Sequence, residues 1–87
     1  MQSVGVIGAG QMGAGIAQVA AQAGYRVLLA DVDKARAEAG KAGIAKRLAR
    51  DVEKEKIDAA TRDRVLERIE PVDGVAAMAP CALVIEA

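Results

Sequence analysis

Histidine is absent from this chain of 87 residues, and cysteine occurs once, as Cys81. A single cysteine cannot form an intramolecular disulfide, so the sequence gives no support for an oxidising compartment. We expect Cys81 to be a small buried apolar residue. Ser3 and Thr61 have no base beside them, and without histidine no nucleophile, metal cluster or acid/base couple can be assembled. The chain therefore carries no complete catalytic site of its own.

Net charge and long apolar runs are also missing. Twelve Lys and Arg balance twelve Asp and Glu, so charge gives no argument for nucleic acid or an anionic membrane as a partner. Hydrophobic residues make up 53% of the chain, but they form short segments, none of which is long enough to cross a membrane. Met1 stands just before the first expected strand and leaves no room for a secretory or transit segment, which favours a cytoplasmic protein.

The charges that are present are unevenly distributed. Residues 1–25 carry no charged side chain, whereas eleven of the twelve basic residues lie between Lys34 and Arg68. Charged side chains favour solvated surface and uncharged segments favour burial. We therefore expect the first third of the chain to form the buried core and the ligand-binding site. The middle of the chain is expected to form solvent-exposed helices.

A glycine-rich motif follows the first apolar run, Val4 to Ile7, and reads Gly8-Ala9-Gly10-Gln11-Met12-Gly13. In this pattern Gly8 allows a tight turn out of a strand and Gly10 allows bare backbone to approach a pyrophosphate. Gly13 allows close packing of a helix on the strand. A phosphate would then rest at the N-terminus of that helix, where free N–H groups stabilise an anion.

The segments around this motif predict a strand, a helix and a second strand. Ser3 to Ile7 is expected to be a strand buried on both faces, and Arg26 to Ala30 the second strand. Between them a helix over residues 11–23 is expected to turn one apolar face to the core, formed by Met12, Ile16, Val19, Ala20 and Ala23. A right-handed crossover makes the two strands parallel, which delivers Asp31 to the same edge as the glycine loop.

Residues 34–70 predict an inserted helical hairpin. Roughly 35 residues separate the second and third strands, and a simple crossover needs only about a dozen. In the first helix Ile44, Leu48 and Val52 form a packing stripe. Asp58 is placed to cap a second helix, which we expect to carry Val65, Leu66 and Ile69 on one side and to stop at Pro71.

The remaining residues predict a short third strand at Pro71 and Val72, a brief helix capped by Asp73, and a fourth strand at Leu83 to Ile85. Together these elements indicate an α/β fold with a partial Rossmann-type parallel sheet in the order 3-2-1-4. The fourth strand would leave an apolar sheet edge open, so we expect poor solubility or self-association of the isolated chain.

Four stretches of sequence are distinctive in combination: residues 4–18 (VGVIGAGQMGAGIAQ), 31–33 (DVD), 53–57 (EKEKI) and 83–87 (LVIEA). Together they resemble the N-terminal part of the L-3-hydroxyacyl-CoA dehydrogenases, in particular the 3-hydroxybutyryl-CoA dehydrogenase branch. The resemblance implies NAD-dependent oxidation of a 3-hydroxyacyl-CoA to the 3-oxoacyl-CoA, as in fatty acid β-oxidation. It also implies that residues 1–87 are the N-terminal part of an NAD-binding domain.

The resemblance assigns the cofactor-binding residues position by position. The glycine loop, with Gly8, Gly10 and Gly13 and the backbone of Gln11 and Met12, would hold the NAD pyrophosphate. Asp31 would accept hydrogen bonds from the adenosine ribose, and its charge would repel the 2′-phosphate of NADP. Ala87 matches a position that lines the cofactor near its nicotinamide half.

In the family that this chain resembles, the helical excursion helps to bind coenzyme A. Lys46, Arg50 and Lys54 recur every four residues on one helix, and Lys56 follows, so these cations would meet its phosphates. A solvated helix face is the other interpretation of the same pattern. Arg47 takes the position nearest to a serine that some members use, which removes that hydroxyl contact.

The resemblance also implies what this chain does not contain. The family's chemistry uses a histidine paired with a glutamate, and neither the catalytic half of the cofactor domain nor the helical dimerising domain is present. Glu86 is the acid nearest the expected site, and we interpret it as structural. We therefore expect the 87 residues alone to be inactive and the parent enzyme to be a homodimer.

Three alternatives share parts of the pattern. The 3-hydroxyisobutyrate and 6-phosphogluconate type of dehydrogenase has a similar loop but passes to the third strand without the hairpin. A flavoprotein uses a similar loop, but the acidic residue at the end of its second strand is more often glutamate than aspartate. A nucleotide-binding module without a reaction of its own is the third alternative, and residues of this chain do not distinguish it from the enzyme.

Overall fold

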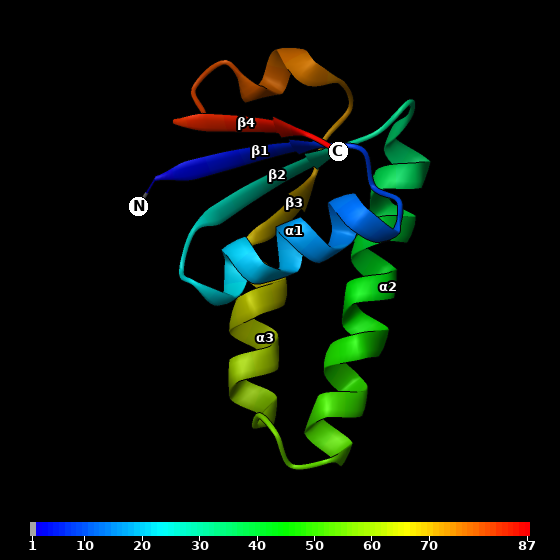
Figure 1. Cartoon of the computed structure of the whole chain (residues 1–87), viewed down its shortest axis with the longest axis vertical. Helices are drawn as coiled ribbons and strands as arrows, with labels where there is room; N and C mark the ends of the chain where they lie inside the picture. Colours follow the sequence, from blue (N-terminus) through cyan, green and yellow to red (C-terminus); the bar gives the residue numbers. More distant parts are fainter. Residues whose placement is uncertain (1) are drawn as a thin grey trace.

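The sheet consists of four parallel strands in the order β3-β2-β1-β4 (Figure 1). This computed structural model describes residues 2–87. The strands are β1 (Ser3–Ile7), β2 (Arg26–Ala30), β3 (Ile69–Pro71) and β4 (Leu83–Glu86). The expected α/β class and the predicted order 3-2-1-4 are confirmed.

The register brings the ends of three strands to one edge of the sheet. In β1, Ile7 lies opposite Ala30 of β2 and Glu86 of β4. The residues that follow these partners are Gly8, Asp31 and Ala87. Because the strands are parallel, all three segments leave the sheet on the same side.

Three α-helices lie against one face of the sheet, as Figure 1 shows. They are α1 (Gln11–Gln22), α2 (Lys34–Glu53) and α3 (Ala59–Glu67). The predicted hairpin is formed by α2 and α3, which pack against each other and extend well beyond the sheet. The short 3₁₀ helix η1 (Val75–Met78) lies at the other side of the sheet. Among the residues that the structure describes, no helix is both long and apolar enough to span a membrane.

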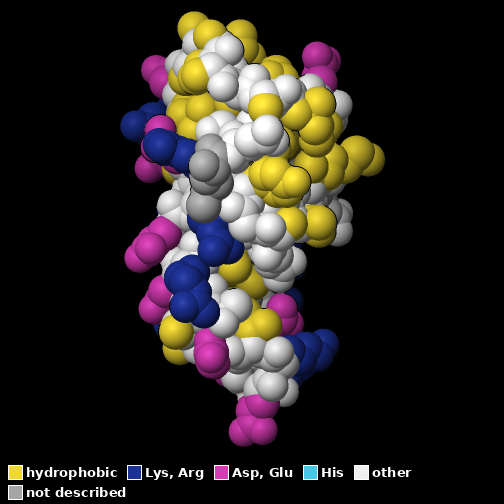
Figure 2. All heavy atoms as spheres, turned by 90° about the vertical axis from the view of Figure 1, so that its left-hand side faces the viewer, with side chains coloured by type: hydrophobic (Ala, Val, Ile, Leu, Met, Phe, Trp, Pro, Cys, Tyr) yellow, Lys and Arg dark blue, Asp and Glu magenta, His cyan; other side chains and the backbone are white. Residues whose placement is uncertain are grey.

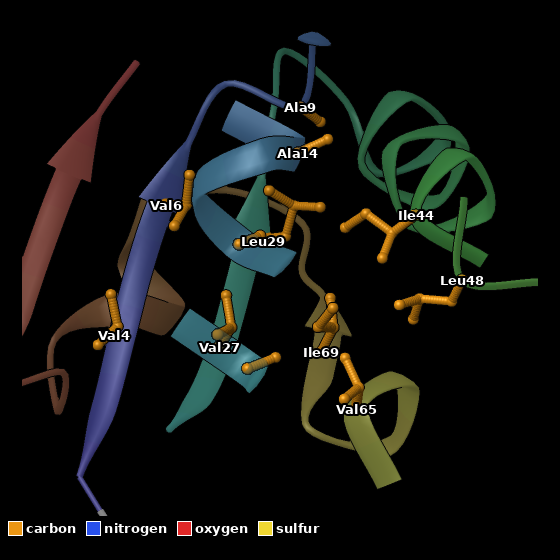
Figure 3. Close-up of a cluster of buried hydrophobic side chains, with 12 residues drawn as sticks. Val4, Val6, Ala9, Ala14, Val27, Leu29, Ile44, Leu48, Val65 and Ile69 are labelled. Atoms are coloured by element: carbon orange, nitrogen blue, oxygen red, sulfur yellow. The ribbon is translucent and has the colours of Figure 1, made fainter. Parts of the chain in front are cut away.

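The main core fills the space between the sheet and the helices (Figure 3). Val27 and Leu29 point from β2 toward Ile44 and Leu48 of α2, and all four side chains are inaccessible to solvent. The strand alternates, so Leu28 points to the opposite face. There it joins a smaller cluster with Ala30, Val72 and Met78, against which the half-buried Cys81 packs.

Side-chain caps and a left-handed turn define the hairpin. Asp33 accepts a hydrogen bond from the amide of Arg36 at 2.8 Å, and Asp58 accepts one from the amide of Thr61 at 2.7 Å. The cap predicted for Asp58 is therefore confirmed. After α2 the chain turns at Glu55, whose φ is 58°, and the amide of Lys56 donates to the carbonyl of Asp51 at 2.9 Å. This is the six-residue hydrogen bond of a Schellman motif.

The expected end of the second hairpin helix was wrong. Ile69 does not belong to α3, which ends at Glu67; it lies in β3 opposite Val27 and is 1% exposed. Pairing with β2 buries this β-branched side chain fully, which a further helical turn would not do. Pro71 consequently ends a strand on the edge of the sheet, where its missing N–H is tolerated, instead of stopping the helix.

The predicted core face of α1 was wrong for Met12, Val19 and Ala23, which are exposed, whereas Ile16 and Ala20 are partly buried against the main core. The helix buries its small residues Gly13, Ala14, Ala17 and Ala21, whereas Met12 is 71% and Val19 67% exposed. Small side chains allow the helix axis to approach the strands closely, and that approach decides which side faces the sheet. Met12 and Val19 are left facing outward.

One local cap was assigned to the wrong residue. The N-cap of η1 is Gly74, with φ 101° and no side-chain hydrogen bond, so Asp73 does not cap this helix. A glycine accepts that conformation without strain, which removes the need for a side-chain cap at this turn.

Candidate nucleotide-binding site

The glycine loop joins β1 to α1 and is held by backbone contacts. The amide of Gly8 donates to the carbonyl of Ala30 at the end of β2, with an N–O distance of 2.8 Å. Its φ of 106° lies in the left-handed region that favours glycine. The turn that the sequence predicted at Gly8 is therefore present, and it starts directly at the edge of the sheet.

Gly13 is where α1 approaches this turn most closely. A Cβ added to Gly13 would overlap with the carbonyl oxygen of Gly8. Gly10, in contrast, faces open space, and a Cβ added there would have no other atom within 4 Å. The two glycines thus serve different needs: Gly13 allows packing inside the protein, and Gly10 leaves bare backbone on the outside.

The N-terminus of α1 presents free amides at this bare backbone. The amide of Ala14 donates to the carbonyl of Gly10 at 2.8 Å, so the amides of Gln11, Met12 and Gly13 precede the first hydrogen bond of the helix. Gly10 provides no side-chain cap, and the first turn contains no acidic residue. These donors and the helix dipole favour an anion at this position.

Asp31 lies directly against the loop. Its Oδ2 accepts a hydrogen bond from the amide of Ala9 at 2.6 Å, and its Oδ1 accepts one from the amide of Val32 at 2.6 Å. These bonds, the one from Ala9 foremost, hold the pKa of the Asp31 carboxyl below its ordinary value, with help from the charge of Arg36. The carboxylate is therefore ionised at neutral pH and remains partly exposed beside the loop.

Ala87 completes this edge from the other side. Its amide donates to the carbonyl of Ile7 at 2.9 Å, and its carbonyl oxygen lies 3.0 Å from the position of a Cβ on Gly8. The structure thus brings together the predicted set of Gly8, Gly13, Asp31 and Ala87 at the carboxyl ends of three strands. A small residue at position 87 keeps this approach to the loop open.

These features fit an adenine dinucleotide. Such a cofactor needs free donors for a pyrophosphate, a surface without side chains beneath it, and an acid within reach of a ribose. The α1 amides, Gly10 and Asp31 meet the three requirements in turn. Nothing in the described residues suggests a metal instead, because no three His, Cys, Asp or Glu side chains among residues 2–87 could hold an ion.

Sequence reasoning missed the importance of Gly40. This residue is buried in α2, and a Cβ there would lie 2.8 Å from the Cβ and 2.9 Å from the carbonyl oxygen of Ala9. Gly40 therefore allows α2 to pack against the glycine loop. The sequence did contain a signal for this role. A glycine inside a helix of Ala, Lys and Glu destabilises the helix by roughly 1 kcal/mol relative to Ala, so its presence needs a packing reason.

Arg47 has a role in packing that the sequence did not indicate. It reaches from α2 to α1, where its Nε donates to Oε1 of Gln18 at 3.0 Å. Its Nη2 is buried and has no hydrogen-bond partner among residues 2–87. Arg47 also contributes to a hollow next to the glycine loop, lined by Gly10, Gln11 and Gly43.

The four cations proposed from the sequence lie along the last part of α2 and the turn that follows it. Lys46 and Arg50 lie on α2, Lys54 is its C-cap, and Lys56 follows the turn at Glu55. At about 100° per residue, Arg50 and Lys54 lie on the Arg47 side of α2, while Lys46 lies opposite its buried residues. All four are exposed, and none forms an ion pair within the described part of the chain.

A family model matches nearly the whole chain. Residues 3–87 correspond to "3-hydroxyacyl-CoA dehydrogenase, NAD binding domain". Among curated proteins, a 3-hydroxybutyryl-CoA dehydrogenase of Bradyrhizobium diazoefficiens is 46% identical over 86 residues, which are 99% of this chain and 29% of that protein. A 3-hydroxyadipyl-CoA dehydrogenase of Escherichia coli is 46% identical over 87 residues, 100% of this chain and 18% of that protein.

Solved structures agree in fold. The (S)-3-hydroxybutyryl-CoA dehydrogenase PaaH1 of Ralstonia eutropha superposes with a TM-score of 0.94 at 37% identity, over 100% of this chain and 31% of that one. FadB2 of Mycobacterium tuberculosis gives a TM-score of 0.94 at 41% identity, over 100% of this chain and 30% of that one. The chain therefore spans less than a third of the length of these relatives.

Proposed function

The chain belongs to the 3-hydroxyacyl-CoA dehydrogenase family, through the NAD-binding domain, and we propose that it serves as the adenosine-binding part of an enzyme that oxidises an L-3-hydroxyacyl-CoA, such as 3-hydroxybutyryl-CoA, to the 3-oxoacyl-CoA. The observation that carries this proposal is the 2.6 Å hydrogen bond between the amide of Ala9 and the Asp31 carboxylate. It puts a fixed negative charge beside an anion-binding helix terminus. That combination suits a ribose next to a pyrophosphate.

In this proposal each residue of the edge has a distinct task. The amides of Gln11, Met12 and Gly13 bind the pyrophosphate, and Gly10 lets it approach the backbone. Asp31 accepts hydrogen bonds from the ribose hydroxyls and disfavours a 2′-phosphate by charge repulsion. Ala87 lines the path toward the nicotinamide with a side chain too small to obstruct it.

Bound NAD would be the hydride acceptor, and the residues of this chain would hold it in position. Without any histidine, these 87 residues offer no base to remove the hydroxyl proton of the substrate. We therefore propose that the residues of this chain bind and orient, and that a histidine–glutamate pair elsewhere in a protein of the relatives' length moves the proton. The chain alone is expected to be inactive.

A chimera tests the proposed activity directly. In the Bradyrhizobium dehydrogenase, the matched 86 residues would be replaced by the corresponding residues of this chain. We expect the purified chimera to reduce NAD with 3-hydroxybutyryl-CoA, and an Asp31→Ala chimera to show a raised KM for NAD. A folded chimera that binds NAD but oxidises no 3-hydroxyacyl-CoA would contradict the proposed reaction.

We extend the proposal to coenzyme A, with Lys46, Arg50, Lys54 and Lys56 as the groups that meet its phosphates. Their exposure and their lack of ion pairs among residues 2–87 support this. Arg50 and Lys54 are the strongest candidates because they lie on the side of α2 next to α1. Each charge-assisted contact to a phosphate contributes about 1.5–3 kcal/mol when it is well formed.

Lys41 provides a matched control for this coenzyme A proposal. It lies on the other side of α2, near Glu38, Leu66 and Pro71. In the chimera, Lys54→Ala and Arg50→Ala are expected to raise KM for the acyl-CoA about tenfold, while Lys41→Ala leaves it unchanged. Equal effects of all three variants would indicate a nonspecific charge effect and would contradict the assignment.

Assembly and location follow from the same proposal. We propose that the whole enzyme is a homodimer held by a helical domain outside these residues, and that it acts in the cytoplasm. The single cysteine cannot form a disulfide within these residues, so the chain offers no support for an oxidising compartment.

A further inference from the structure

Arg47 differs from the other basic residues of the hairpin. On the face shown in Figure 2, basic and acidic side chains are interspersed over the hairpin end. Arg47 is half-buried and forms no ion pair within residues 2–87. Its Nη2 atom is buried without a hydrogen-bond partner among these residues, whereas the half-buried Arg62 and Arg68 have no such atom. Native proteins seldom leave a buried guanidinium nitrogen unpaired, because its burial without a hydrogen bond costs free energy.

A neighbouring side chain holds the Arg47 guanidinium in place. Its Nε donates to Oε1 of Gln18 on α1 at 3.0 Å, in a partly buried hydrogen bond. Because a guanidinium is planar, one anchored nitrogen restricts the directions of the other two. Arg47 is therefore a pre-positioned cation, and a ligand that binds it loses less affinity to the ordering of a long side chain.

A hollow of about 380 Å³ lies beside this side chain, between the start of α1 and the middle of α2. Part of its wall is bare backbone, because a Cβ added to Gly10 or Gly43 would have no other atom within 4 Å. Arg47 is the one charged residue in its lining, and the other lining residues are Ala9, Gln11, Ala14, Ala39 and Gly40. With a cation and no carboxylate in its lining, the hollow favours an anion.

We propose that this hollow binds a phosphate group, with Arg47 as its charged donor. Arginine suits a phosphate because two of its N–H groups can donate in parallel to two oxygens. The hollow adjoins the glycine loop at Gly10, and Arg50 lies on the Arg47 side of α2. Two ligands have this chemistry, the pyrophosphate of NAD and the phosphates of coenzyme A. The choice between them rests on the function proposed above, whereas phosphate binding at Arg47 does not.

Calorimetric titration of the 87-residue chain with inorganic pyrophosphate tests the proposal without assuming either ligand. Arg47→Met keeps an apolar stem and removes the charge, and it is expected to weaken pyrophosphate binding about tenfold. Arg64→Met is the matched control, because Arg64 is exposed on α3 and lines a different hollow with Arg26 and Glu70. The pyrophosphate affinity of this control is expected to match that of the original chain. Gln18→Leu leaves Arg47 in place without its anchor and is expected to weaken binding by a smaller factor.

Titrations of the same variants with NAD and with coenzyme A identify the source of the phosphate. Arg47→Met is expected to weaken the binding of the ligand whose phosphate occupies the hollow and to leave the other unchanged, and circular dichroism checks that each variant is folded. No pyrophosphate binding by the original chain, or equal weakening by Arg47→Met and Arg64→Met, would overturn the proposal. A chain that binds pyrophosphate through Arg47 but binds neither NAD nor coenzyme A would instead contradict the proposed function.

Discussion

The glycine loop edge and the α2–α3 hairpin are built on opposite principles. At the glycine loop, residues 8–13, the contacts are between backbone atoms. The Gly8 amide donates to the Ala30 carbonyl, and Gly13 packs against the Gly8 carbonyl. In the hairpin, side chains provide the stability, through Ile44 and Leu48 in the core and Asp58 at a helix terminus. The packed positions of the loop, Gly8 and Gly13, therefore tolerate almost no added atom, whereas the exposed positions of the hairpin tolerate substitution with smaller losses of stability.

This difference has a functional meaning. A site that binds a phosphate through backbone amides needs bare, rigidly held backbone, and glycine packing provides it. For the coenzyme A contacts proposed above, exposed cations would need a stable support, and an Ala-rich helical hairpin would provide one. The following substitutions test how far the two regions differ.

Gly13→Ala is expected to have the largest effect. The added Cβ overlaps with the backbone carbonyl of Gly8, which cannot move without breaking the loop, so the free energy of unfolding should fall by more than about 4 kcal/mol. Gly43→Ala is the matched change in the hairpin, where a Cβ meets nothing within 4 Å. It should raise the free energy of unfolding by up to about 1 kcal/mol. Urea denaturation measures both, and equal losses would refute the contrast.

Leu48→Ala is expected to have the next largest effect. Leu48 is inaccessible to solvent in the main core, so its truncation leaves a cavity that costs about 3 kcal/mol of unfolding free energy. Val52 is half-buried one turn later on α2. Changing it to Ala should lower the free energy of unfolding by less than about 1.5 kcal/mol. Thermal denaturation provides the comparison. A loss at Val52 as large as that at Leu48 would mean that the core boundary lies elsewhere.

Asp58→Ala removes one helix cap and should lower the free energy of unfolding at neutral pH, by less than Leu48→Ala does. Hydrogen bonds from the side chain and the amide of Thr61 lower the pKa of the Asp58 carboxyl in the folded chain. Its contribution is therefore complete above the unfolded pKa of about 3.9 and is lost as the pH falls through the lower folded pKa. Denaturation of both proteins at a series of pH values should show the stability difference shrinking under acid. A difference that persists would contradict the carboxylate cap.

Glu55→Gly should give the smallest effect, with the opposite sign. Glu55 adopts the left-handed conformation at the end of α2, where glycine avoids a Cβ penalty, so we expect a gain of about 0.5–1 kcal/mol. Glu53→Gly, inside the last turn of the same helix, should instead lose about 0.5–1 kcal/mol. Shifts of the denaturant midpoint in opposite directions for the two variants would support the Schellman motif at the end of α2, and shifts in the same direction would exclude it.

Sequence patterns predicted the elements more reliably than their outward faces. The strand order, the hairpin and the Asp58 cap follow from local signals that no tertiary contact opposes. The face of α1 did not follow, because hydrophobicity favoured Met12 and Val19 while close approach to the sheet selected Gly13 and Ala17. Ile69 was misassigned for a related reason: its burial against Val27 depends on strand pairing, which helical periodicity does not encode.

The candidate site was predictable where backbone conformation decides it. Gly8, Gly13 and Asp31 follow from the motif and its spacing to the second strand, and the structure brings them together. Gly40 was not recognised, because its role depends on how α2 crosses Ala9, and no local pattern records that crossing. Arg47 and Gln18 are 29 positions apart in the sequence and lie on different helices, so their hydrogen bond could not be predicted from a local pattern either.

Calorimetric titration of this chain with NAD and with NADP tests the central claim that the loop and Asp31 together receive the adenosine half of NAD. We predict that NAD binds at least about tenfold more tightly than NADP. Asp31→Ala should weaken NAD binding at least about tenfold, and Asp31→Asn, which keeps an acceptor for the Ala9 amide, should mainly abolish the preference over NADP. Unchanged NAD affinity in a folded Asp31→Ala chain would contradict the account.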